Sequence, residues 1–509
     1  MENRTPKIVL KHSRIEINRY HWGDAPQLEY FFSVYDRVRH NNFIKGIWYD
    51  DKKEILYLPR GMDLATLSNS FASSPVIDTY CDPFVITKQI PIRYLAKDKR
   101  QFEILKFIVG RDNYAYTRTR SQIAINSTTG SGKTFVTIGS ICFMGARAMI
   151  ITSNIEWLEQ WKAKIFEYTN LTENDIYMIV GASSIDKLFY RDPMQYQIFL
   201  CSHATIQSYA KAKGWEKIDE LFKSLKIYMK VYDEAHLYFD NMTQIDYHTN
   251  TAKTVYLTAT PGKSDRQENI IYKEYFRNIP SIELRLESDN HVNYIGIFFN
   301  SNPDAYQISS FSKGQYNFER STYTRYLVEQ ENFIKLLVIL VDMCLKMDGK
   351  ILIYIGVNEA INRVYQYMIQ YFPFLEGHIG IYNSETPKDI KATMLSKKFI
   401  LSTTKSAGTA KDIPYLCCNI VLAEPFKSEI TARQTLGRCR ADNTIYIDCV
   451  DNSVQKTKKY YRDKKTIFLE YAKSCKETYI RDDDLDVRYN EVIAKYSNLS
   501  SINVQIFDE

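Results

Sequence analysis

The sequence lacks the cysteine patterns that mark disulfide-rich and zinc-binding proteins. Its 509 residues include nine cysteines, yet these form no C-x-x-C pair and have no histidine partner at zinc spacing. A disulfide framework needs regularly spaced, paired cysteines, and a structural zinc site needs closely spaced ligands. The sequence therefore argues against both.

Signals for export and for membrane insertion are missing as well, as are short repeats and low-complexity tracts. The first ten residues carry charges and no apolar core, unlike a signal peptide. The longest apolar stretch, about 136–152, is interrupted by Gly139, Gly145 and Arg147 and is too short to cross a bilayer. We expect a soluble intracellular protein without a membrane partner. It would lie in the cytoplasm, that of a host cell if the protein is viral, and a monomer is plausible.

The composition is that of a globular protein with more than one core. Hydrophobic residues make up 45% and charged residues 25% of the chain, which are ordinary values for soluble domains. The chain is too long for one ordinary core, so we expect about two to four domains. The formal net charge of +6 is compatible with a nucleic-acid partner but does not establish one, because a local groove matters more than the total.

A glycine-containing segment at 127–134 carries the strongest chemical signal. It reads Ser-Thr-Thr-Gly-Ser-Gly-Lys-Thr, follows a strand-like run at 123–126 and precedes an apolar helical pattern. A strand, a glycine loop and a helix N-terminus in this order direct backbone N–H groups at phosphate oxygens. Lys133 would contact the β- and γ-phosphates, and the Thr134 hydroxyl would bind Mg²⁺. The predicted ATP-binding residues of the loop are Thr129, Gly130, Ser131, Gly132, Lys133 and Thr134.

Two adjacent carboxylates follow about a hundred residues later. Asp233 and Glu234 come directly after an apolar run, 227–232, that predicts a buried strand. Asp233 is predicted to hold Mg²⁺, largely through water, and Glu234 to polarise the water that attacks the γ-phosphate. Together, the loop and this pair predict hydrolysis of a nucleoside triphosphate.

Three further polar residues stand near this pair. His236 alone would more often be a hydrogen-bonded core histidine, but directly after Asp-Glu-Ala it fits a link between the metal site and neighbouring motifs. Thr258 and Thr260 close the next strand-like run. They are either ordinary turn hydroxyls or parts of a relay beside the ATP site, and their position favours the relay.

The second half of the chain supplies candidate cations on a predicted helix at 434–440. Two arginines two residues apart are usually a solvated helix face. ATPases, however, need a cation to neutralise the charge that develops on the γ-phosphate, and a second lobe delivers it on closure. We predict that Arg438 and Arg440 complete the site and that Gln434 helps to sense the γ-phosphate.

Strand-like and helical runs alternate twice along the chain, which is typical of two parallel sheets covered by helices. The predicted fold is α/β, with two tandem lobes behind a small α+β unit. The predicted divisions are 1–90, a small α+β domain and a candidate for DNA binding; 91–285, the first lobe; 286–340, linker and connecting helices; 341–475, the second lobe; and 476–509, a C-terminal tail.

As a set, these motifs resemble superfamily 2 helicases of the DExH type. The match comprises motif I at 127–134, motif II at 233–236, motif III at 258–260 and motif VI at 434–440. The resemblance implies two RecA-like lobes, ATP hydrolysis with Mg²⁺, and a nucleic-acid partner. It also implies an adenine-reading glutamine about thirty residues before Lys133, where Gln101 stands. A plain surface glutamine is the alternative.

Two departures from the family pattern bear on the site. The usual last motif is Q-x-x-G-R-x-x-R, whereas Arg440 comes one residue early and Ala441 occupies the usual place. Which arginine acts as the finger is therefore open, with Arg438 as the sensor if the two roles are divided. The segment that resembles motif Ia lacks its usual proline and has Thr-Ser-Asn at 152–154.

Nucleic-acid contacts follow by family analogy from the segments that resemble motifs Ib and V. Hydroxyls and backbone N–H groups in such segments touch phosphates, and the candidates are Thr205, Thr404 and Gly408. A basic run with interleaved tyrosines, 456–465, could add phosphate and stacking contacts. A solvated helix face is the alternative.

Short runs in the N-terminal unit, at 28–33, 46–50 and 58–61, resemble the front domain of phage UvsW-type helicases. This resemblance implies a viral or phage helicase that unwinds or branch-migrates DNA, branched or single-stranded, in recombination, repair or replication. The alternatives are an RNA helicase or transcript-release ATPase and, from another class, a nucleic-acid-binding ATPase switch that unwinds nothing. The motifs do not separate these functions, because they contact ATP and the nucleic-acid backbone.

Overall fold

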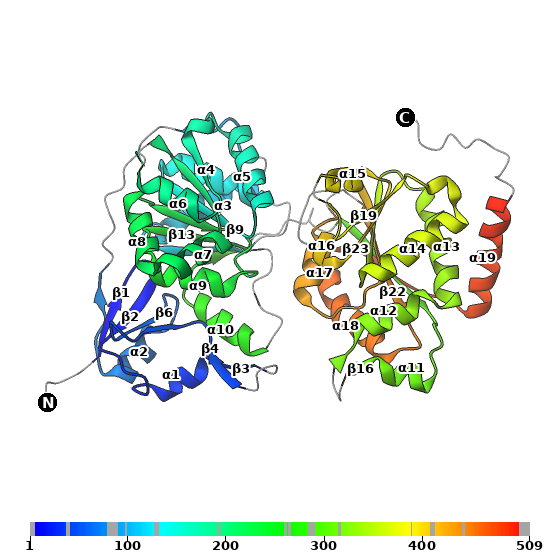
Figure 1. Ribbon diagram of the computed structural model, residues 1–509, viewed down its shortest axis with the longest axis horizontal. Coiled ribbons are helices and arrows are strands. Elements are labelled where there is room, and N and C mark those ends of the chain that lie inside the picture. The colour runs from blue at the N-terminus through cyan, green and yellow to red at the C-terminus, as the bar shows by residue number, and fades with distance from the viewer. Residues whose placement is uncertain are drawn as a thin grey trace. The chain divides into compact units, whose positions relative to one another are not determined.

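The computed structural model divides into two compact units, residues 1–285 and 286–509, which we describe separately (Figure 1). The structure describes residues 6–36, 41–78, 90–96, 99–126, 132–190, 192, 195–258, 262, 266–283, 291–313, 317–387, 389–407, 413–439 and 443–497. Among these residues, no helix is both long and apolar enough to cross a membrane.

The first unit begins with a small mixed sheet, whose strand order is β5-β6-β2-β1-β7. Consecutive residues of β1, β2 and β6 are buried, and Ile15 and Ile17 lie on the same face of β2 within the hydrophobic core. A separate antiparallel hairpin, β3–β4, extends this N-terminal module. The elements are β1 (Lys7–Leu10), β2 (Arg14–Asn18), α1 (Pro26–Phe31), β3 (Ser33–Asp36), β4 (Asn41–Ile44), β5 (Trp48–Asp50), β6 (Ile55–Pro59), α2 (Leu64–Phe71) and β7 (Val76–Ile77).

A seven-stranded parallel sheet follows, in the order β10-β11-β9-β12-β13-β8-β14. Its central strands are buried on both faces, which is why they read as continuous apolar runs. The strands are β8 (Gln122–Asn126), β9 (Ala148–Thr152), β10 (Ile176–Ile179), β11 (Ile198–Ser202), β12 (Met229–Tyr232), β13 (Lys253–Thr258) and β14 (Ser281–Ile282). The helices are α3 (Lys99–Val109), α4 (Lys133–Met144), α5 (Ile155–Tyr168), α6 (Ala182–Phe189), α7 (His203–Lys213), α8 (Trp215–Ser224), α9 (Phe239–His248) and α10 (Arg266–Phe276).

The two faces of this sheet are covered differently. Helices α3, α4 and α5 pack on one face and form a hydrophobic core with alternate strand residues such as Ile125 and Ile150. On the other face, helices α6 to α10 and the N-terminal module form a single core, which joins Ile17 and Leu58 to Tyr256. The N-terminal module is therefore an integral layer of the first unit.

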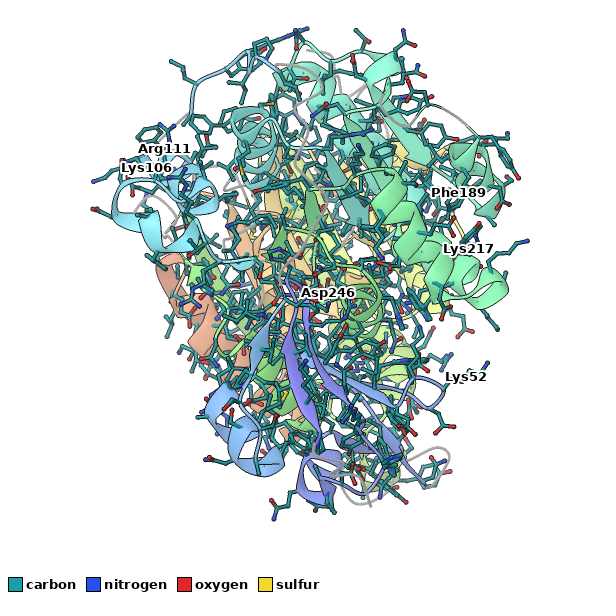
Figure 2. All side chains as sticks on the ribbon, turned by 90° about the vertical axis from the view of Figure 1, so that its left-hand side faces the viewer. Lys52, Lys106, Arg111, Phe189, Lys217 and Asp246 are labelled. Atoms are coloured by element: carbon teal, nitrogen blue, oxygen red, sulfur yellow. The ribbon has the colours of Figure 1, made fainter. Side chains whose placement is uncertain are left out.

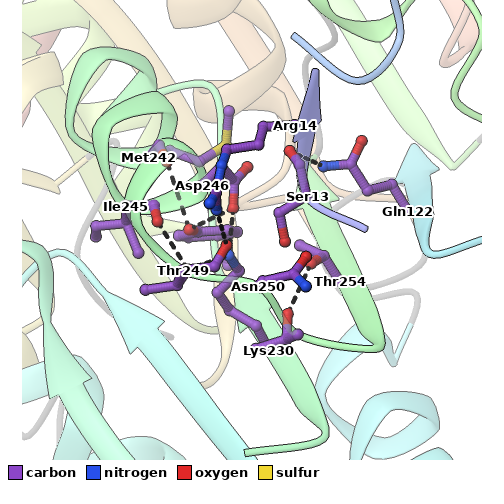
Figure 3. A network of polar contacts seen from close by, with 12 residues as sticks. Ser13, Arg14, Gln122, Lys230, Met242, Ile245, Asp246, Thr249, Asn250 and Thr254 are labelled. Carbon is purple, nitrogen blue, oxygen red and sulfur yellow. Dashed lines mark hydrogen bonds and ion pairs between the residues drawn. The ribbon is translucent and has the colours of Figure 1, made fainter. Parts of the chain in front are cut away.

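Buried polar contacts reinforce this junction (Figure 3). The Gln122 amide donates to the Ser13 carbonyl at 3.0 Å and to the Tyr256 hydroxyl at 2.7 Å. Close by, Asp246 and Lys230 form a fully buried ion pair at 2.5 Å. Figure 2 shows Asp246 in the interior, whereas Lys52 and Lys217 project outward. This buried ion pair joins β12 to α9 within the first lobe, and removing one partner alone would leave an uncompensated buried charge.

The second unit is built around another seven-stranded parallel sheet, in the order β19-β20-β18-β21-β22-β15-β23. Its strands are β15 (Val292–Phe299), β18 (Lys350–Ile355), β19 (Ile379–Tyr382), β20 (Phe399–Ser402), β21 (Leu416–Ala423), β22 (Ile445–Asp451) and β23 (Ala472–Tyr479), with a small hairpin of β16 (Ser312–Lys313) and β17 (Asn317–Phe318). The helices are α11 (Ala305–Ser310), α12 (Arg320–Val328), α13 (Glu331–Leu345), α14 (Asn358–Tyr371), α15 (Lys391–Ser396), α16 (Thr404–Ala407), α17 (Glu429–Leu436), α18 (Gln455–Leu469) and α19 (Asp482–Ser497).

Two predicted divisions of this half need correction. The segment 286–340 is not a linker throughout, because β15 pairs with both β22 and β23 inside the sheet. The segment 476–509 is not simply a tail, because β23 extends to Tyr479 and Lys335 of α13 pairs with Asp486 of α19 at 2.5 Å. Both errors arise because the partners of these elements lie more than a hundred residues away in the sequence.

Candidate active site

The predicted phosphate loop lies between β8 and α4, where the described chain resumes at Gly132. Gly132 adopts a positive φ of 86° as the N-cap of α4, a conformation that suits glycine. Lys133 is the first helical residue and is 9% exposed, and Thr134 follows it in the first turn. The helix N-terminus therefore presents backbone N–H groups beside a lysine, the arrangement that binds phosphate. Thr129, Gly130 and Ser131 lie outside the described residues.

Gln101 lies directly against this loop. It is on α3 and only 8% exposed. A Cβ atom added to Gly132 would come within 2.2 Å of the Gln101 Nε2 atom. The alternative of an exposed surface glutamine therefore does not hold, and contact with adenine stays a prediction.

Asp233 and Glu234 stand at the carboxyl end of β12, in the middle of the first parallel sheet. The Asp233 N–H donates to the Ile151 carbonyl at 3.0 Å, and the Ala235 N–H donates to the Leu257 carbonyl at 2.9 Å. These bonds tie the motif to the strands on both sides. Glu234 has a positive φ of 50°, which is uncommon for a residue with a side chain and is found at functional sites.

The Asp233 carboxylate is poorly compensated within the fold. Its Oδ2 atom accepts a hydrogen bond from Trp161 Nε1 at 2.8 Å. Burial and, next, the neighbouring Glu234 charge raise the pKa of Asp233 to about 6, against the opposing effects of the Trp161 bond and the Lys133 charge. Burial and the adjacent Glu234 charge thus disfavour the ionised form of Asp233, and a nearby cation would favour it.

His236 links this pair to the next strand. The ring is 1% exposed, and its Nδ1 atom lies 2.8 Å from Thr258 Oγ1 and 3.4 Å from Glu234 Oε2. The structure thus brings together Glu234, His236 and Thr258, as the relay interpretation requires. Thr260 lies outside the described residues.

In the second unit, Gln434 and Arg438 lie on α17 and just after it. The end of this helix is held by β21, because the Asn419 amide on that strand donates to the Thr435 carbonyl at 3.0 Å. Burial raises the pKa of the Tyr354 phenol on β18, and the positive charge of Arg438 opposes that rise. The positive charge of Arg438 is therefore close enough to Tyr354 of β18 to act on its phenol. Arg440 lies outside the described residues.

The candidate nucleic-acid contacts occupy different surroundings. Thr205 is in the first turn of α7, and its N–H donates to Ser202 Oγ at 3.2 Å. Thr404 is engaged within the protein, because its N–H and its hydroxyl donate to the two carboxylate oxygens of Glu424 at 2.8 and 2.5 Å. A phosphate contact through the Thr404 hydroxyl would therefore have to compete with Glu424. Gly408 lies outside the described residues.

Glu424 is a residue that the sequence analysis missed. It comes directly after β21, as Asp233 comes directly after β12. Burial raises the pKa of Glu424 to about 7, although the hydrogen bonds from Thr404 lower it. The sequence did offer one signal, a single carboxylate directly after a buried strand. It gave no sign of the hydrogen-bond partner, Thr404, twenty residues earlier.

The basic run on α18 is only partly available to a ligand. Lys464 is 2% exposed and pairs with Asp448 at 2.6 Å, and Lys465 pairs with Glu477 at 2.5 Å. Tyr461 is buried in the core and stacks on Tyr294. The remaining basic residues of the run, Lys456, Lys458, Lys459 and Arg462, keep the prediction of a nucleic-acid contact open.

The residues present fit MgATP. Lys133 and the N-terminus of α4 offer positive potential to phosphates, while Thr134 and Asp233 offer the oxygen ligands that Mg²⁺ prefers. The Trp161 hydrogen bond and the Lys133 charge favour the ionised form of the Asp233 carboxylate, against burial and the neighbouring Glu234 charge.

Two all-parallel sheets with helices on both faces, and a phosphate loop in the first of them, define tandem RecA-like lobes, which confirms the predicted fold class. Among solved structures, S. cerevisiae Dbp5 bound to RNA and ADP BeF3 matches 77% of this chain and 92% of its own, with 15% identity and a TM-score of 0.50. At that identity the likeness concerns the fold alone.

Residues 94–263 match a protein-family model described as "Type III restriction enzyme, res subunit". A relative named DNA 3'-5' helicase XPB, from Mycobacterium tuberculosis, is 29% identical over 147 residues, which are 28% of this chain and 24% of the relative. The chain thus covers about a quarter of that relative's length. These findings support a superfamily 2 helicase ATPase, and helicases of this superfamily use ATP with Mg²⁺.

The finer resemblance to UvsW-type helicases is not established by these comparisons. The crystal structure of T4 UvsW matches 93% of this chain and 99% of its own, with 13% identity and a TM-score of 0.37. A TM-score this low carries no argument about specific function.

Proposed function

We propose that this chain is an ATP-dependent helicase or translocase whose substrate is DNA. The observation that carries the proposal lies at the carboxyl ends of β12 and β13, where contacts link Glu234, His236 and Thr258. Asp233, directly before Glu234, accepts a hydrogen bond from Trp161. The relative named DNA 3'-5' helicase XPB matches 28% of this chain, which favours DNA over RNA.

In this proposal each residue of the site has one task. Lys133, Thr134 and Asp233 bind MgATP, and bound Mg²⁺ neutralises phosphate charge. Glu234 positions and polarises the attacking water, because its carboxylate is 17% exposed beside the His236 ring. His236 and Thr258 transmit the state of the site along the edge of the sheet.

The second lobe completes the chemistry in the proposed mechanism. Arg438 and Arg440 neutralise charge that develops on the γ-phosphate, and Gln434 senses that phosphate. Closure around ATP and opening after hydrolysis would move the lobes along a strand, with Thr205, Thr404 and Gly408 near the nucleic-acid backbone. A branched-DNA substrate and a role in viral or phage recombination rest on the N-terminal runs that resemble UvsW-type helicases.

The substrate class is tested by measuring ATP hydrolysis with forked DNA, single-stranded DNA and RNA at equal nucleotide concentration. We expect forked DNA to stimulate the rate most and RNA least. Greater stimulation by RNA would replace the DNA assignment with an RNA helicase or a transcript-release ATPase.

Unwinding is tested by strand displacement from a forked duplex. Glu234→Gln should lower both ATP turnover and displacement by about 10²- to 10⁴-fold, the range expected for loss of a general base. Glu376→Gln, an exposed glutamate of the second unit, serves as the control and should match the unmodified protein. ATP turnover by the unmodified protein without displacement would identify an ATPase switch and refute the helicase.

A further inference from the structure

A two-residue segment of the N-terminal module touches both helices that follow the ATP-site motifs. Lys45 and Gly46 are the first two of the three residues that connect β4 to β5. The Lys45 side chain, 12% exposed, pairs with Glu268 at 2.5 Å and with Asp240 at 3.1 Å. One cation therefore holds two acidic side chains from two different helices.

Those helices begin close to the catalytic motifs. Asp240 is in the first turn of α9, which starts three residues after His236. Glu268 is in the first turn of α10, which starts eight residues after Thr258. Because a helix moves as a stiff unit, a shift at His236 would be carried along α9 to Asp240, one of the two carboxylates that Lys45 holds. Figure 1 shows α10 beside β4 within the first unit.

Gly46 is a second point of contact between the module and these two helices. Its carbonyl accepts a hydrogen bond from the Tyr247 hydroxyl of α9 at 2.5 Å. It has a φ of +83°, and an added Cβ atom would come within 2.6 Å of Ile271 Cγ2 on α10. Both its conformation and its surroundings thus require glycine, and the backbone lies in direct contact with α10.

The charge at this junction is stable at neutral pH. Burial lowers the pKa of Lys45, but the hydrogen bond to Glu268 and the charge of Asp240 outweigh burial and raise the pKa above its usual value. Lys45 therefore stays charged and ion-paired at neutral pH. A movement of the motifs, and not a change of protonation, would strengthen or weaken this ion pair.

We propose that Lys45 and Gly46 couple the N-terminal module to the nucleotide site, with Lys45 as a positioning residue that joins α9 and α10 to β4 and β5. The inference rests on nucleotide binding at the proposed site. A nucleotide that shifts the ends of β12 and β13 moves α9 and α10 and, through them, the module. By thermodynamic linkage, a ligand held by the module would change nucleotide affinity by the same factor.

The coupling is tested by hydrogen exchange of the amides in residues 41–50, with and without a non-hydrolysable ATP analogue and Mg²⁺. We expect the analogue to change exchange there in the unmodified protein. Lys45→Met should abolish most of that change, and Lys45→Arg should retain it. The full chain is used, because the module shares its core with the first sheet and its removal would expose that core.

A matched control distinguishes coupling from general loosening. Lys53 belongs to the same module and pairs with Glu216 of α8 at 3.0 Å, so Lys53→Met removes an ion pair that does not touch α9 or α10. An equal effect of Lys53→Met and Lys45→Met would overturn the proposal. So would an unmodified protein that binds the analogue without any exchange change in 41–50.

A charge exchange and an activity assay complete the test. Lys45→Glu combined with Glu268→Lys should restore part of the response that Lys45→Glu alone removes, whereas no restoration would contradict a specific pair. DNA stimulation of ATP hydrolysis should fall about fivefold in Lys45→Met, the lower end of typical coupling, with the basal rate unchanged. Exchange coupling in a protein that no nucleic acid stimulates would support the junction and refute the helicase proposal.

Discussion

The two parallel sheets each place a carboxylate at the carboxyl end of a central strand, but they compensate its charge differently. Asp233 follows β12 and Glu424 follows β21. Burial raises the pKa of both, to about 6 and about 7 respectively. The same topology thus buries a carboxylate at the edge of each sheet, where its ionised form is disfavoured.

The two edges differ in the groups that stabilise the buried carboxylate. Glu424 accepts hydrogen bonds on both oxygens from Thr404, so its partner is part of the fold. Asp233 accepts one from Trp161 and stands beside a second carboxylate. The comparison teaches that the second edge satisfies its carboxylate within the fold, whereas the first edge concentrates two negative charges, as the proposed Mg²⁺ site requires.

The largest effect on ATP hydrolysis is expected from substitution of Arg438, through which the second lobe would take part in the reaction. Arg438→Ala should lower the rate of ATP hydrolysis by about 10³-fold or more, as expected for an arginine finger, and leave ATP binding nearly intact. Steady-state hydrolysis and equilibrium binding of a fluorescent ATP analogue measure the two quantities.

Arg433, on the same helix, offers a matched control, because it pairs with Glu429 and donates to the Tyr471 hydroxyl. Arg433→Gln should affect stability more than hydrolysis. Lost ATP binding in Arg438→Ala would show that this arginine is structural and would leave Arg440 as the candidate finger.

An intermediate effect is expected from Trp161, whose indole N–H donates to the Asp233 carboxylate of the first edge. Trp161→Phe removes a hydrogen bond to a charged group, worth about 1.5 kcal/mol, so kcat/KM for MgATP should fall about tenfold. Trp157→Phe, one turn earlier on α5, is the control for loss of an indole. A result equal in both variants would mean that packing, and not the bond to Asp233, decides the outcome.

The smallest effect on hydrolysis is expected at Glu424, if its role is confined to the fold. Its pKa is raised in the folded state, so the folded protein binds more protons than the unfolded protein between about pH 4.5 and pH 7. Ionised Glu424 therefore costs stability as the pH rises through that window. Glu424→Gln removes this dependence.

The check is denaturant unfolding at several pH values between 5 and 8. Between these limits the unmodified protein should lose on the order of 2 kcal/mol more stability than Glu424→Gln, with hydrolysis at pH 7.5 changed by less than about threefold. A loss of hydrolysis as large as that of Glu234→Gln would break the comparison, because the second edge would then act directly in catalysis.

Much of the fold could be predicted, because its signals are local. Apolar runs at 123–126 and 227–232 predicted the strands β8 and β12, since a strand buried on both faces must be apolar throughout. The strands β15 and β23 were missed. β23 is largely exposed and reads as polar, and β15 joins strands that come much later in the chain.

In the candidate site, too, local features could be predicted and contacts between distant residues could not. The placement of Lys133, Asp233 and Glu234 near one sheet edge follows from strand–loop–helix patterns a few residues long. The bonds from Trp161 to Asp233 and from Thr404 to Glu424 span 72 and 20 residues, and no periodicity reports such pairs.

The sequence by itself determined the class of chemistry, because phosphate binding and water activation need particular side chains at fixed short spacings. Only the tertiary structure decided how the charges are compensated and how the N-terminal module is attached. Lys45 illustrates the reason: its partners, Asp240 and Glu268, are nearly two hundred residues or more away, and packing of the whole first unit brings them together.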